Sequence, residues 1–362
     1  MTTVTTATTA RRRAVEWLER EADGLARAVT DLQYTRVPAL AARFGEEGRV
    51  KCEQDARHHL DYLTSALRGD SDVLFVRYVE WAKVLLGAHG VGVEDLRLNL
   101  TVLREVLLAQ VAAEDAALVT RPIDAALEQL DEMPSSLPSM IRPGAPHAGL
   151  ARRYLDAMLA GERRRAMKIV TGAVEDGVPV RDVYLHVFEP VQHEIGRLWQ
   201  ENEISVATEH YCTAITQLVI SQLYPYVFSA ERRGLTLIAT CIEGDLHELG
   251  VRIVADFFEM EGWDTIYLGA NVPLAGIVET VAERRADLVA VSATISKHTR
   301  SVEALVKALR GSDTTRAVPV MVGGYPFNLE PELWRRLGAS GHAPNASRAV
   351  EVGLRLVRGA DA

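Results

Sequence analysis

The last third of the chain contains the pattern that most constrains the fold. Four short runs rich in β-branched residues follow one another there: LTLIAT (235–240), DTIYLG (264–269), DLVAVSA (287–293) and VPVMVGG (318–324). Helical patterns such as LGVRIVADFFEMEG and SVEALVKALRG follow these runs. Alternation of strands and helices predicts a parallel sheet that helices cover on both faces. Ligands of such sheets bind in the loops at the carboxyl ends of the strands.

The preceding two thirds of the chain predict helices in two groups. Apolar residues recur at helical spacing from about residue 11 to 132, which we expect to form an all-α domain. Residues 133–149 hold four prolines and two glycines, so we expect a linker without regular structure. Residues 150–232 predict a four-helix bundle, and residues 233–362 the sheet domain. The Thr- and Ala-rich start, MTTVTTATTARRR, is expected to be a disordered lead-in.

Composition excludes several classes of protein. The net charge of −9 argues against a broad nucleic-acid-binding face. No stretch is long and apolar enough to cross a bilayer, and the start lacks the apolar core of a secretory signal. The three cysteines match no metal-binding spacing and are typical of reduced thiols. We therefore expect a cytoplasmic protein that binds neither DNA nor membranes.

The segment EGDLHELG (243–250) follows the first predicted strand and so lies on the ligand edge of the sheet. A neutral imidazole such as that of His247 is a good ligand for a transition metal, and Asp245 can accept its other ring proton. Gly250 leaves space where a bulky group must pass. The alternative is that His247 only caps the following helix.

Two further segments follow later strands, SATIS (292–296) and GGYPF (323–327). The order D-x-H-x-x-G, S-x-T and G-G on successive strands resembles the cobalamin-binding domain family, and LGANVP (268–273) matches the turn after its second strand. The resemblance covers residues 234–358 and implies a five-stranded, Rossmann-like cobalamin-binding domain.

The resemblance implies a role for each matched position. His247 would ligate cobalt from below in place of the cofactor's own dimethylbenzimidazole (base-off/His-on), and Asp245 would hold its other nitrogen. The displaced base and its nucleotide tail would run into a slot of the sheet. The remaining cobalamin-binding candidates are Leu246, Gly250, Ser292, Thr294, Gly323, Gly324 and Tyr325.

The segment LWQENEISVATEHY (198–211) in the predicted bundle resembles the cap of light-sensing cobalamin photoreceptors. That resemblance implies that Trp199 packs on a 5′-deoxyadenosyl upper ligand, and that Glu209 and His210 contact it. Those receptors carry a histidine directly after the tryptophan, which captures cobalt after illumination, and here that position is Gln200. His210 and His193 are the alternatives for that role. Trp199 could also be an ordinary core aromatic.

The helical front end contains RHHLDYLTSALRGDSDVLFVRYVEWAKVLLGAHGV (57–91), which resembles sensor-globin-like domains without haem. The whole architecture is similar to the photocobilins, which are proposed to pair adenosylcobalamin with a bilin such as biliverdin. Adjacent His58 and His59 point about 100° apart on a helix, so at most one faces a given pocket. Cys52 is not expected to attach a bilin. Candidate bilin residues are Arg36, Lys51, Arg57, His58, His59, Tyr62, Tyr78, Trp81 and His89; the alternative is that most of them are solvated or capping residues.

The sequence thus predicts a photoreceptor and not an enzyme. Adenosylcobalamin, and biliverdin as a second chromophore, would absorb light, and photolysis of the cobalt–carbon bond would change contacts in a homo-oligomer, expected to be a dimer, for an unknown protein partner. Two alternatives remain: a corrinoid carrier protein for a methyltransferase, and a regulator that senses cobalamin in the dark. A radical mutase is the least favoured class, because its substrate domain is absent.

Overall fold

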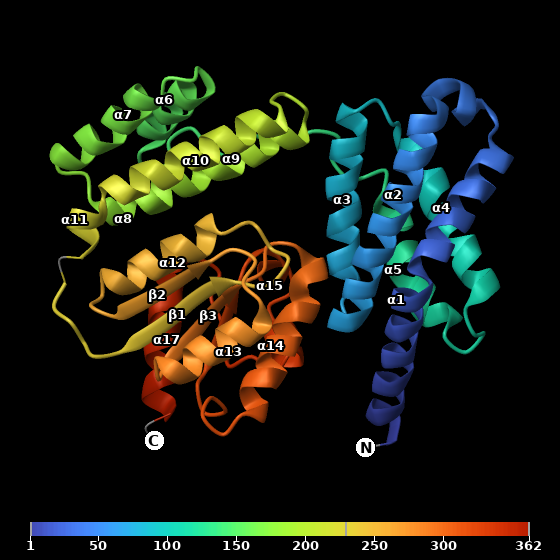
Figure 1. Cartoon of the computed structure of the whole chain (residues 1–362). Coiled ribbons are helices and arrows are strands. Elements are labelled where there is room, and N and C mark those ends of the chain that lie inside the picture. The colour runs from blue at the N-terminus through green and yellow to red at the C-terminus, as the bar shows by residue number, and fades with distance from the viewer. Residues whose placement is uncertain (1, 229, 361–362) are drawn as a thin grey trace. The chain divides into compact units, whose positions relative to one another are not determined.

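The computed structural model describes residues 2–228 and 230–360, which form two compact units that divide between Ser135 and Ser136. The first unit is all-α, as predicted. Its helices are α1 (Thr2–Arg36), α2 (Ala39–Gly69), α3 (Asp72–Ala88), α4 (Val93–Gln110) and α5 (Ala116–Gln129) (Figure 1). Helix α1 packs along α2 and α4, and α3 packs on α5, around fully buried side chains such as Leu25, Leu60, Phe75, Leu103 and Ile123.

The prediction of a disordered segment at the start of the chain is wrong. Helix α1 begins at Thr2 and so includes the described residues of that segment, 2–13. Extending an existing helix needs only one further hydrogen bond per residue, whereas starting one is costly. The threonines and alanines can therefore extend a helix that the amphipathic residues after them establish.

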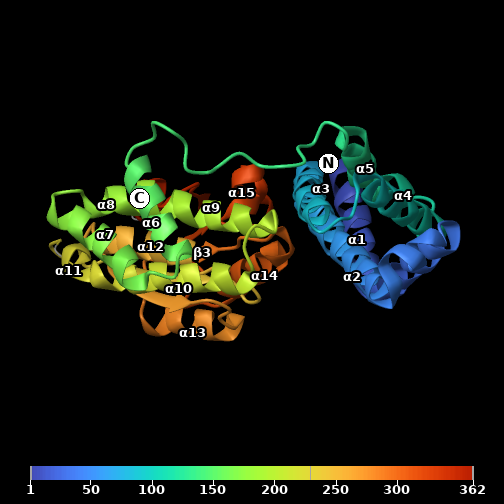
Figure 2. The ribbon, with the colours of Figure 1, turned by 90° about the horizontal axis from the view of Figure 1, so that it is seen from above.

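The second unit begins with the linker and the bundle. Residues 131–147 lack helices and strands, and α6 (Ala148–Leu159) follows. Helix α7 (Arg163–Glu175) leads to one continuous helical stretch, made of α8 (Val180–Val183), the π-helical turn η1 (Tyr184–Phe188) and α9 (Glu189–Gln200). Proline near the start of α9 cannot donate a backbone hydrogen bond, which accounts for the looser turn before it. Helices α10 (Val206–Gln222) and α11 (Tyr224–Val227) complete the bundle, seen from above in Figure 2.

The sheet is parallel and five-stranded, as predicted. Its strands are β1 (Thr236–Cys241), β2 (Asp264–Gly269), β3 (Leu288–Ser292), β4 (Val320–Gly323) and β5 (Gly341–His342), in the order β2-β1-β3-β4-β5. Helices α12 (Leu249–Glu259) and α17 (Ala346–Ala360) cover one face, and α13 (Leu274–Glu283) and α14 (Thr299–Gly311) cover the other (Figure 1). The short helices η2 (Ser296–His298), α15 (Tyr325–Leu329) and α16 (Leu333–Arg336) lie in the connections. The chain changes direction across the sheet between β1 and β3, which places a ligand crevice at their carboxyl ends.

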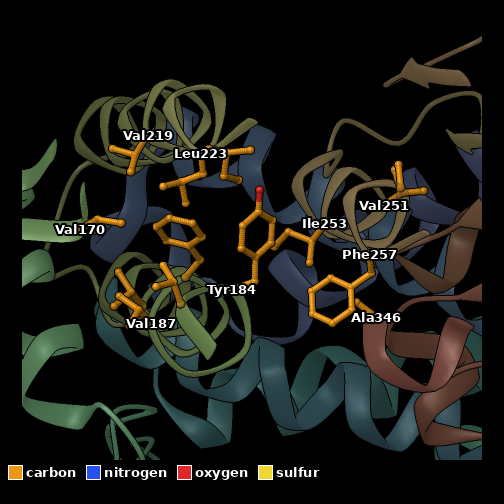
Figure 3. Close-up of a cluster of buried hydrophobic side chains, with 14 of the residues drawn as sticks. Val170, Tyr184, Val187, Val219, Leu223, Val251, Ile253, Phe257 and Ala346 are labelled. Carbon is orange, nitrogen blue, oxygen red and sulfur yellow. The ribbon is translucent and has the colours of Figure 1, made fainter. Parts of the chain in front are cut away.

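One hydrophobic core joins the bundle to the sheet domain. In Figure 3, Tyr184 of η1 lies between bundle side chains, among them Leu223, and the side chains of Ile253 and Phe257 on α12. The Tyr184 hydroxyl donates to the Asp256 carboxylate at 2.8 Å. The bundle is therefore anchored on α12, next to the loop that follows β1.

Candidate functional site

The loop between β1 and α12, residues 242–248, is held in place by the loop after β2. The Gly244 amide donates to the Asn271 side-chain oxygen at 2.9 Å, and the Asn271 amide donates to the Asp245 carbonyl at 3.1 Å. Asn271 adopts a left-handed conformation with φ of 52°. The two loops thus fix each other at the carboxyl edge of the sheet.

Asp245 is fully buried at the centre of this loop. Its Oδ1 accepts from the His247 amide at 3.0 Å and lies 2.7 Å from His247 Nδ1. Its Oδ2 accepts from the Thr294 amide and lies 3.4 Å from His298 Nδ1. Burial alone would raise the pKa of Asp245, but hydrogen bonds from the His247 ring and from the Thr294 and His247 amides, together with the nearby His298 ring, hold it far below its usual range. Asp245 is therefore a fixed negative charge behind the His247 ring.

The His247 side chain is 56% exposed, although its partner is buried. Its hydrogen bond to Asp245 raises the pKa of His247, and the Asp245 charge adds to this effect. Because Nδ1 faces Asp245, Nε2 is the nitrogen that can bind a metal. The capping alternative is wrong: Glu248, not His247, occupies the N-cap of α12, and the His247 ring is turned to Asp245.

Among the described residues, no three His, Cys, Asp or Glu side chains gather as a metal site. A single imidazole backed by a carboxylate suits a metal whose other ligands come from a macrocycle. The donor set therefore fits cobalt in a corrin ring better than a metal held by the protein alone.

The remaining predicted residues of the sheet domain meet at the same edge. Ser292 pairs with Gly323 across β3 and β4, and Thr294 follows in the loop that touches Asp245. Gly324 has φ of +106°, and a Cβ there would lie 2.1 Å from the Ala293 carbonyl oxygen, so only glycine fits. Leu246 and Tyr325 are 70% and 54% exposed, so each large side chain is accessible to a ligand at this edge. A Cβ at Gly250 would enter open space.

The predicted cap residues lie on two adjacent helices of the bundle. Trp199 is half-buried near the end of α9, and Glu209 and His210 lie in the first turn of α10. Ser205 caps α10 by accepting the Thr208 amide at 3.1 Å, a role for which serine is well suited. Two turns further along α10, Gln217 donates to Glu248, the residue next to His247, at 2.7 Å. Helix α10 therefore packs beside the His247 loop.

The Glu209 carboxylate is held from two sides. His210 Nδ1 contacts it, and the Thr213 hydroxyl lies 2.9 Å away. Gln200, at the position where the photoreceptor pattern has histidine, is only 6% exposed. The exposed histidines of this region are His193 on α9 and His210 on α10.

Sequence reasoning missed two residues of this site. His298 lies at the end of η2 and places a second imidazole beside Asp245. Glu248 accepts from Gln217 of α10 at 2.7 Å and from the Tyr267 hydroxyl at 3.0 Å. Glu248 lies within the EGDLHELG segment, and His298 lies two residues after the SATIS segment. Their partners are distant in sequence, so only the fold could reveal these contacts.

The candidate bilin residues of the first unit do not form one open site. Tyr62 stacks on Tyr78 with ring centres 3.7 Å apart, and His59 Nδ1 lies 2.8 Å from the Tyr78 hydroxyl. Burial lowers the pKa of His59 to about 3, so this ring is neutral. Trp81 lies beyond Tyr78, with ring centres 6.2 Å apart. These aromatic residues on α2 and α3 form one cluster.

The other candidates of the first unit lie elsewhere on its surface. Arg36 pairs with Glu105 at 2.7 Å, and Arg57 pairs with Asp23 at 3.0 Å and with Asp61. Lys51 pairs with Glu47 at 2.7 Å. Exposed His89 caps the end of α3, with Nδ1 2.9 Å from the Leu85 carbonyl oxygen. His58 is exposed whereas His59 is buried, in keeping with their predicted divergence.

Three family models match parts of the chain. A B12 binding domain model matches residues 235–351, a second B12 binding domain model matches residues 150–224, and a phycobilisome protein model matches residues 1–130. The bundle and the sheet domain thus correspond to one kind of module, and the first unit to another.

Several named relatives match the bundle and the sheet domain. Dimethylamine corrinoid protein 2 of Methanosarcina acetivorans is 31% identical over 216 residues, which are 58% of this chain and 97% of that protein. Dimethylamine corrinoid protein 3 of the same organism is 24% identical over 208 residues, 56% of this chain and 94% of that protein. The monomethylamine corrinoid protein of Methanosarcina barkeri has a similar fold, with a TM-score of 0.53 and 21% identity over 58% of this chain and 99% of that one.

The fold, the Asp245–His247 loop and the matched models together define a cobalamin-binding protein. The chain belongs to the family of corrinoid proteins. The names of these relatives favour the corrinoid-carrier alternative over the light-sensing interpretation. In the described residues, no helix combines the length and the apolar character required to cross a membrane.

Proposed function

We propose that cobalamin binds at the carboxyl edge of the sheet with its own base displaced and with His247 as the lower ligand of cobalt. The observation that carries this proposal is the exposed His247 ring, held through Nδ1 by a buried, ionised Asp245. Asp245 orients the ring and makes Nε2 a stronger donor. Ser292 and Thr294 would offer hydroxyls to the nucleotide tail, and the Gly323–Gly324 turn would leave it room.

His247→Ala tests this assignment directly. We expect the variant to bind cobalamin more weakly and to lose the base-off/His-on absorption and EPR spectra. His186→Ala, at a half-buried histidine of η1 that has no role in the proposed site, is the control and should keep the lower nitrogen ligand. Unchanged spectra and affinity in His247→Ala would refute the assignment.

The function that the relatives favour is that of a corrinoid carrier for a separate methyltransferase, so the chain would not itself be an enzyme. When bound, the corrinoid supplies a cobalt whose upper face can hold a methyl group. The chain's own part is to hold the cofactor from below through His247 and to cover its upper face with α9 and α10. The relatives named for dimethylamine and monomethylamine support this proposal, since each is almost wholly covered by the match.

A second candidate function, a light sensor, is favoured by two observations. The phycobilisome protein model matches residues 1–130, a region outside both B12 models. In addition, Trp199 lies on α9 and the Glu209–His210 pair on α10, the helix that contacts the His247 loop through the hydrogen bond from Gln217 to Glu248. Adenosylcobalamin would supply a light-sensitive cobalt–carbon bond at this place. Trp199 would cover its adenosyl group, and Glu209 would accept hydrogen bonds from ribose hydroxyls.

For a bilin such as biliverdin, the cluster of Tyr62, Tyr78 and Trp81 is the part of the first unit that best offers flat packing surfaces. Exposed His58 stands one turn before Tyr62 on α2 and could contact pyrrole nitrogens. Arg36 and Arg57 are less suited to bind its propionates, because each is engaged by carboxylates. A globin-like fold of this unit and a light-dependent homodimer belong to the same proposal.

Illumination separates the two functions. The full chain is loaded with adenosylcobalamin and biliverdin, and its absorption spectrum and elution volume are recorded before and after green light. If the cobalamin absorption bands are the same before and after illumination, the result supports the carrier function and excludes the sensor. Light-dependent cobalamin bands, a bound far-red bilin band and a changed elution volume support the sensor with two chromophores. Light-dependent cobalamin bands with a changed elution volume but without bilin uptake limit the sensor to one chromophore, whereas light-dependent bands alone report only photolysis of the cobalt–carbon bond and leave the carrier function in place.

A further inference from the structure

The residue directly after His247 joins three elements of the second unit. Glu248 Oε1 accepts from Gln217 Nε2 of α10 at 2.7 Å. Its Oε2 accepts from the Tyr267 hydroxyl, near the end of β2, at 3.0 Å. Both carboxylate oxygens of Glu248 are thus used, one toward the bundle and one toward the sheet.

Gln217 lies on the same ridge of α10 as the residues that face the upper side of the proposed cofactor. Glu209, Thr213 and Gln217 follow one another at intervals of four residues, and the Thr213 hydroxyl lies 2.9 Å from the Glu209 carboxylate. Because a helix is rigid over two turns, a shift of the Glu209 end of α10 displaces Gln217 as well. Its hydrogen bond to Glu248 would pass that shift to the loop that carries His247.

The rest of the junction between bundle and sheet domain continues along α12. The side chain of Arg252 donates to the Ser221 hydroxyl at 3.0 Å and to the Tyr224 hydroxyl at 3.1 Å, and Asp256 accepts from Tyr184. Glu248, Arg252 and Asp256 are spaced by four residues, so they form one polar edge against the bundle. Glu248 is the end of this edge that adjoins His247.

We propose that Glu248 is a positioning residue for His247, which ties the ligand loop to both α10 and β2 so that the position of the bundle sets how strongly His247 binds cobalt. The inference rests on His247 as the lower ligand. It assigns to Gln217 and Tyr267 a role that neither the carrier nor the sensor function requires, and it applies to both.

The test uses the full chain loaded with cob(II)alamin, which has one axial ligand and so reports the lower nitrogen by EPR without influence from an upper ligand. Gln217→Leu removes the donor on the bundle side, and Tyr267→Phe removes the donor on the sheet side with little change of shape. Gln222→Leu makes the same chemical change at an exposed position of α10 and is the matched control.

We expect Gln217→Leu and Tyr267→Phe each to weaken cobalamin binding about tenfold, as for the loss of a hydrogen bond to a charged group. Part of the EPR signal should then lack the splitting from a lower nitrogen, an effect that a merely structural contact would not produce. Gln222→Leu should keep both the affinity and the splitting.

A double-mutant cycle decides whether the effect acts through His247. In a His247→Ala background, Gln217→Leu should cause no further loss of affinity. The same loss in both backgrounds, or an unchanged EPR spectrum in Gln217→Leu and Tyr267→Phe, overturns the inference. If His247→Ala alone leaves the lower-nitrogen splitting intact, the assignment of the ligand itself has failed.

Discussion

At the scale of single residues, Asp245 shows how a buried charge is kept in this fold. Removing a carboxylate from water is costly unless hydrogen bonds to its ionised form compensate. The His247 ring, the Thr294 amide and the His247 amide provide such bonds, and the His298 ring approaches from the other side. Two imidazoles therefore face one carboxylate, one of them exposed and the other buried.

The charge of Asp245 gives a prediction about His247. Asp245→Asn removes both the charge and the strongest acceptor, which raise the pKa of His247. We expect the pKa of His247 to fall in this variant of the cofactor-free protein, and cobalamin to bind more weakly. NMR titration of the His247 ring protons checks the first effect. Asp264→Asn, which changes an exposed carboxylate at the start of β2, should leave the His247 titration in place.

Gly324 gives a prediction about backbone conformation. Gly324→Ala forces a Cβ into the Ala293 carbonyl at a positive φ, so we expect a loss of about 2–4 kcal/mol in the free energy of unfolding. Gly250→Ala, where the Cβ meets open space in the first turn of α12, should change stability by less than about 1 kcal/mol. Urea denaturation of both variants without cofactor compares them. Equal stability of the two would contradict this account of the turn.

At the scale of secondary structure, the sequence predicted four strands within one or two residues of their observed bounds. It did not locate β5, because Gly341–His342 is only two residues long and has no β-branched pattern. The π-helical turn η1 was also not predicted, since the run 180–200 has ordinary helical periodicity. The Tyr184 hydroxyl of this turn nevertheless donates a hydrogen bond to Asp256 of α12. The contribution of this pair to the contact between the bundle and the sheet domain depends on pH.

Burial raises the pKa of Asp256 to about 6, although the Tyr184 hydroxyl offsets part of this shift. A carboxyl group whose pKa is higher in the folded state is bound to a proton more often there than in the unfolded chain. Its contribution to stability is therefore greatest below its ordinary pKa and falls as the pH rises through about 6. A pKa of about 6 in place of the ordinary carboxyl value corresponds to about 3 kcal/mol.

We therefore predict that Asp256→Asn flattens the pH dependence of the free energy of unfolding between pH 4 and 7. The variant should gain stability relative to the natural protein as the pH rises, since asparagine can still accept the Tyr184 hydroxyl without a buried charge. Urea denaturation at several pH values measures the difference. A parallel pH profile for the two proteins would show that Asp256 is not the group responsible.

At the scale of the whole molecule, the chain consists of two units with separate cores. The corrinoid relatives are almost wholly covered by matches that span 56–58% of this chain, and the two B12 models begin after residue 135. We therefore predict that residues 136–362 fold alone and bind cobalamin with the affinity of the full chain. Calorimetry of that fragment against the full chain tests this, with the His247→Ala fragment as control. A fragment that folds but fails to bind would assign the first unit a direct role in holding the cofactor.

The sequence by itself determined the fold class and the centre of the site. Alternation of strands and helices requires a parallel sheet, and the D-x-H-x-x-G segment after its first strand places His247, Asp245 and Gly250 at the ligand edge. These features are local, because periodicity and spacing along the chain are enough to define them. The resemblance of that segment to cobalamin-binding domains predicted the cofactor, in agreement with the family to which the chain belongs.

Only the tertiary structure decided which distant side chains surround that centre. The sequence predicted His247 as the only histidine beside Asp245. In the structure His298, which is 51 residues further along the chain, also approaches Asp245, and Gln217 reaches Glu248 from another helix. It likewise decided that Gln200 is buried and that the carboxylates of the first unit engage Arg36 and Arg57. Such contacts depend on how elements pack against one another, and packing joins residues whose separation in sequence carries no periodic signal.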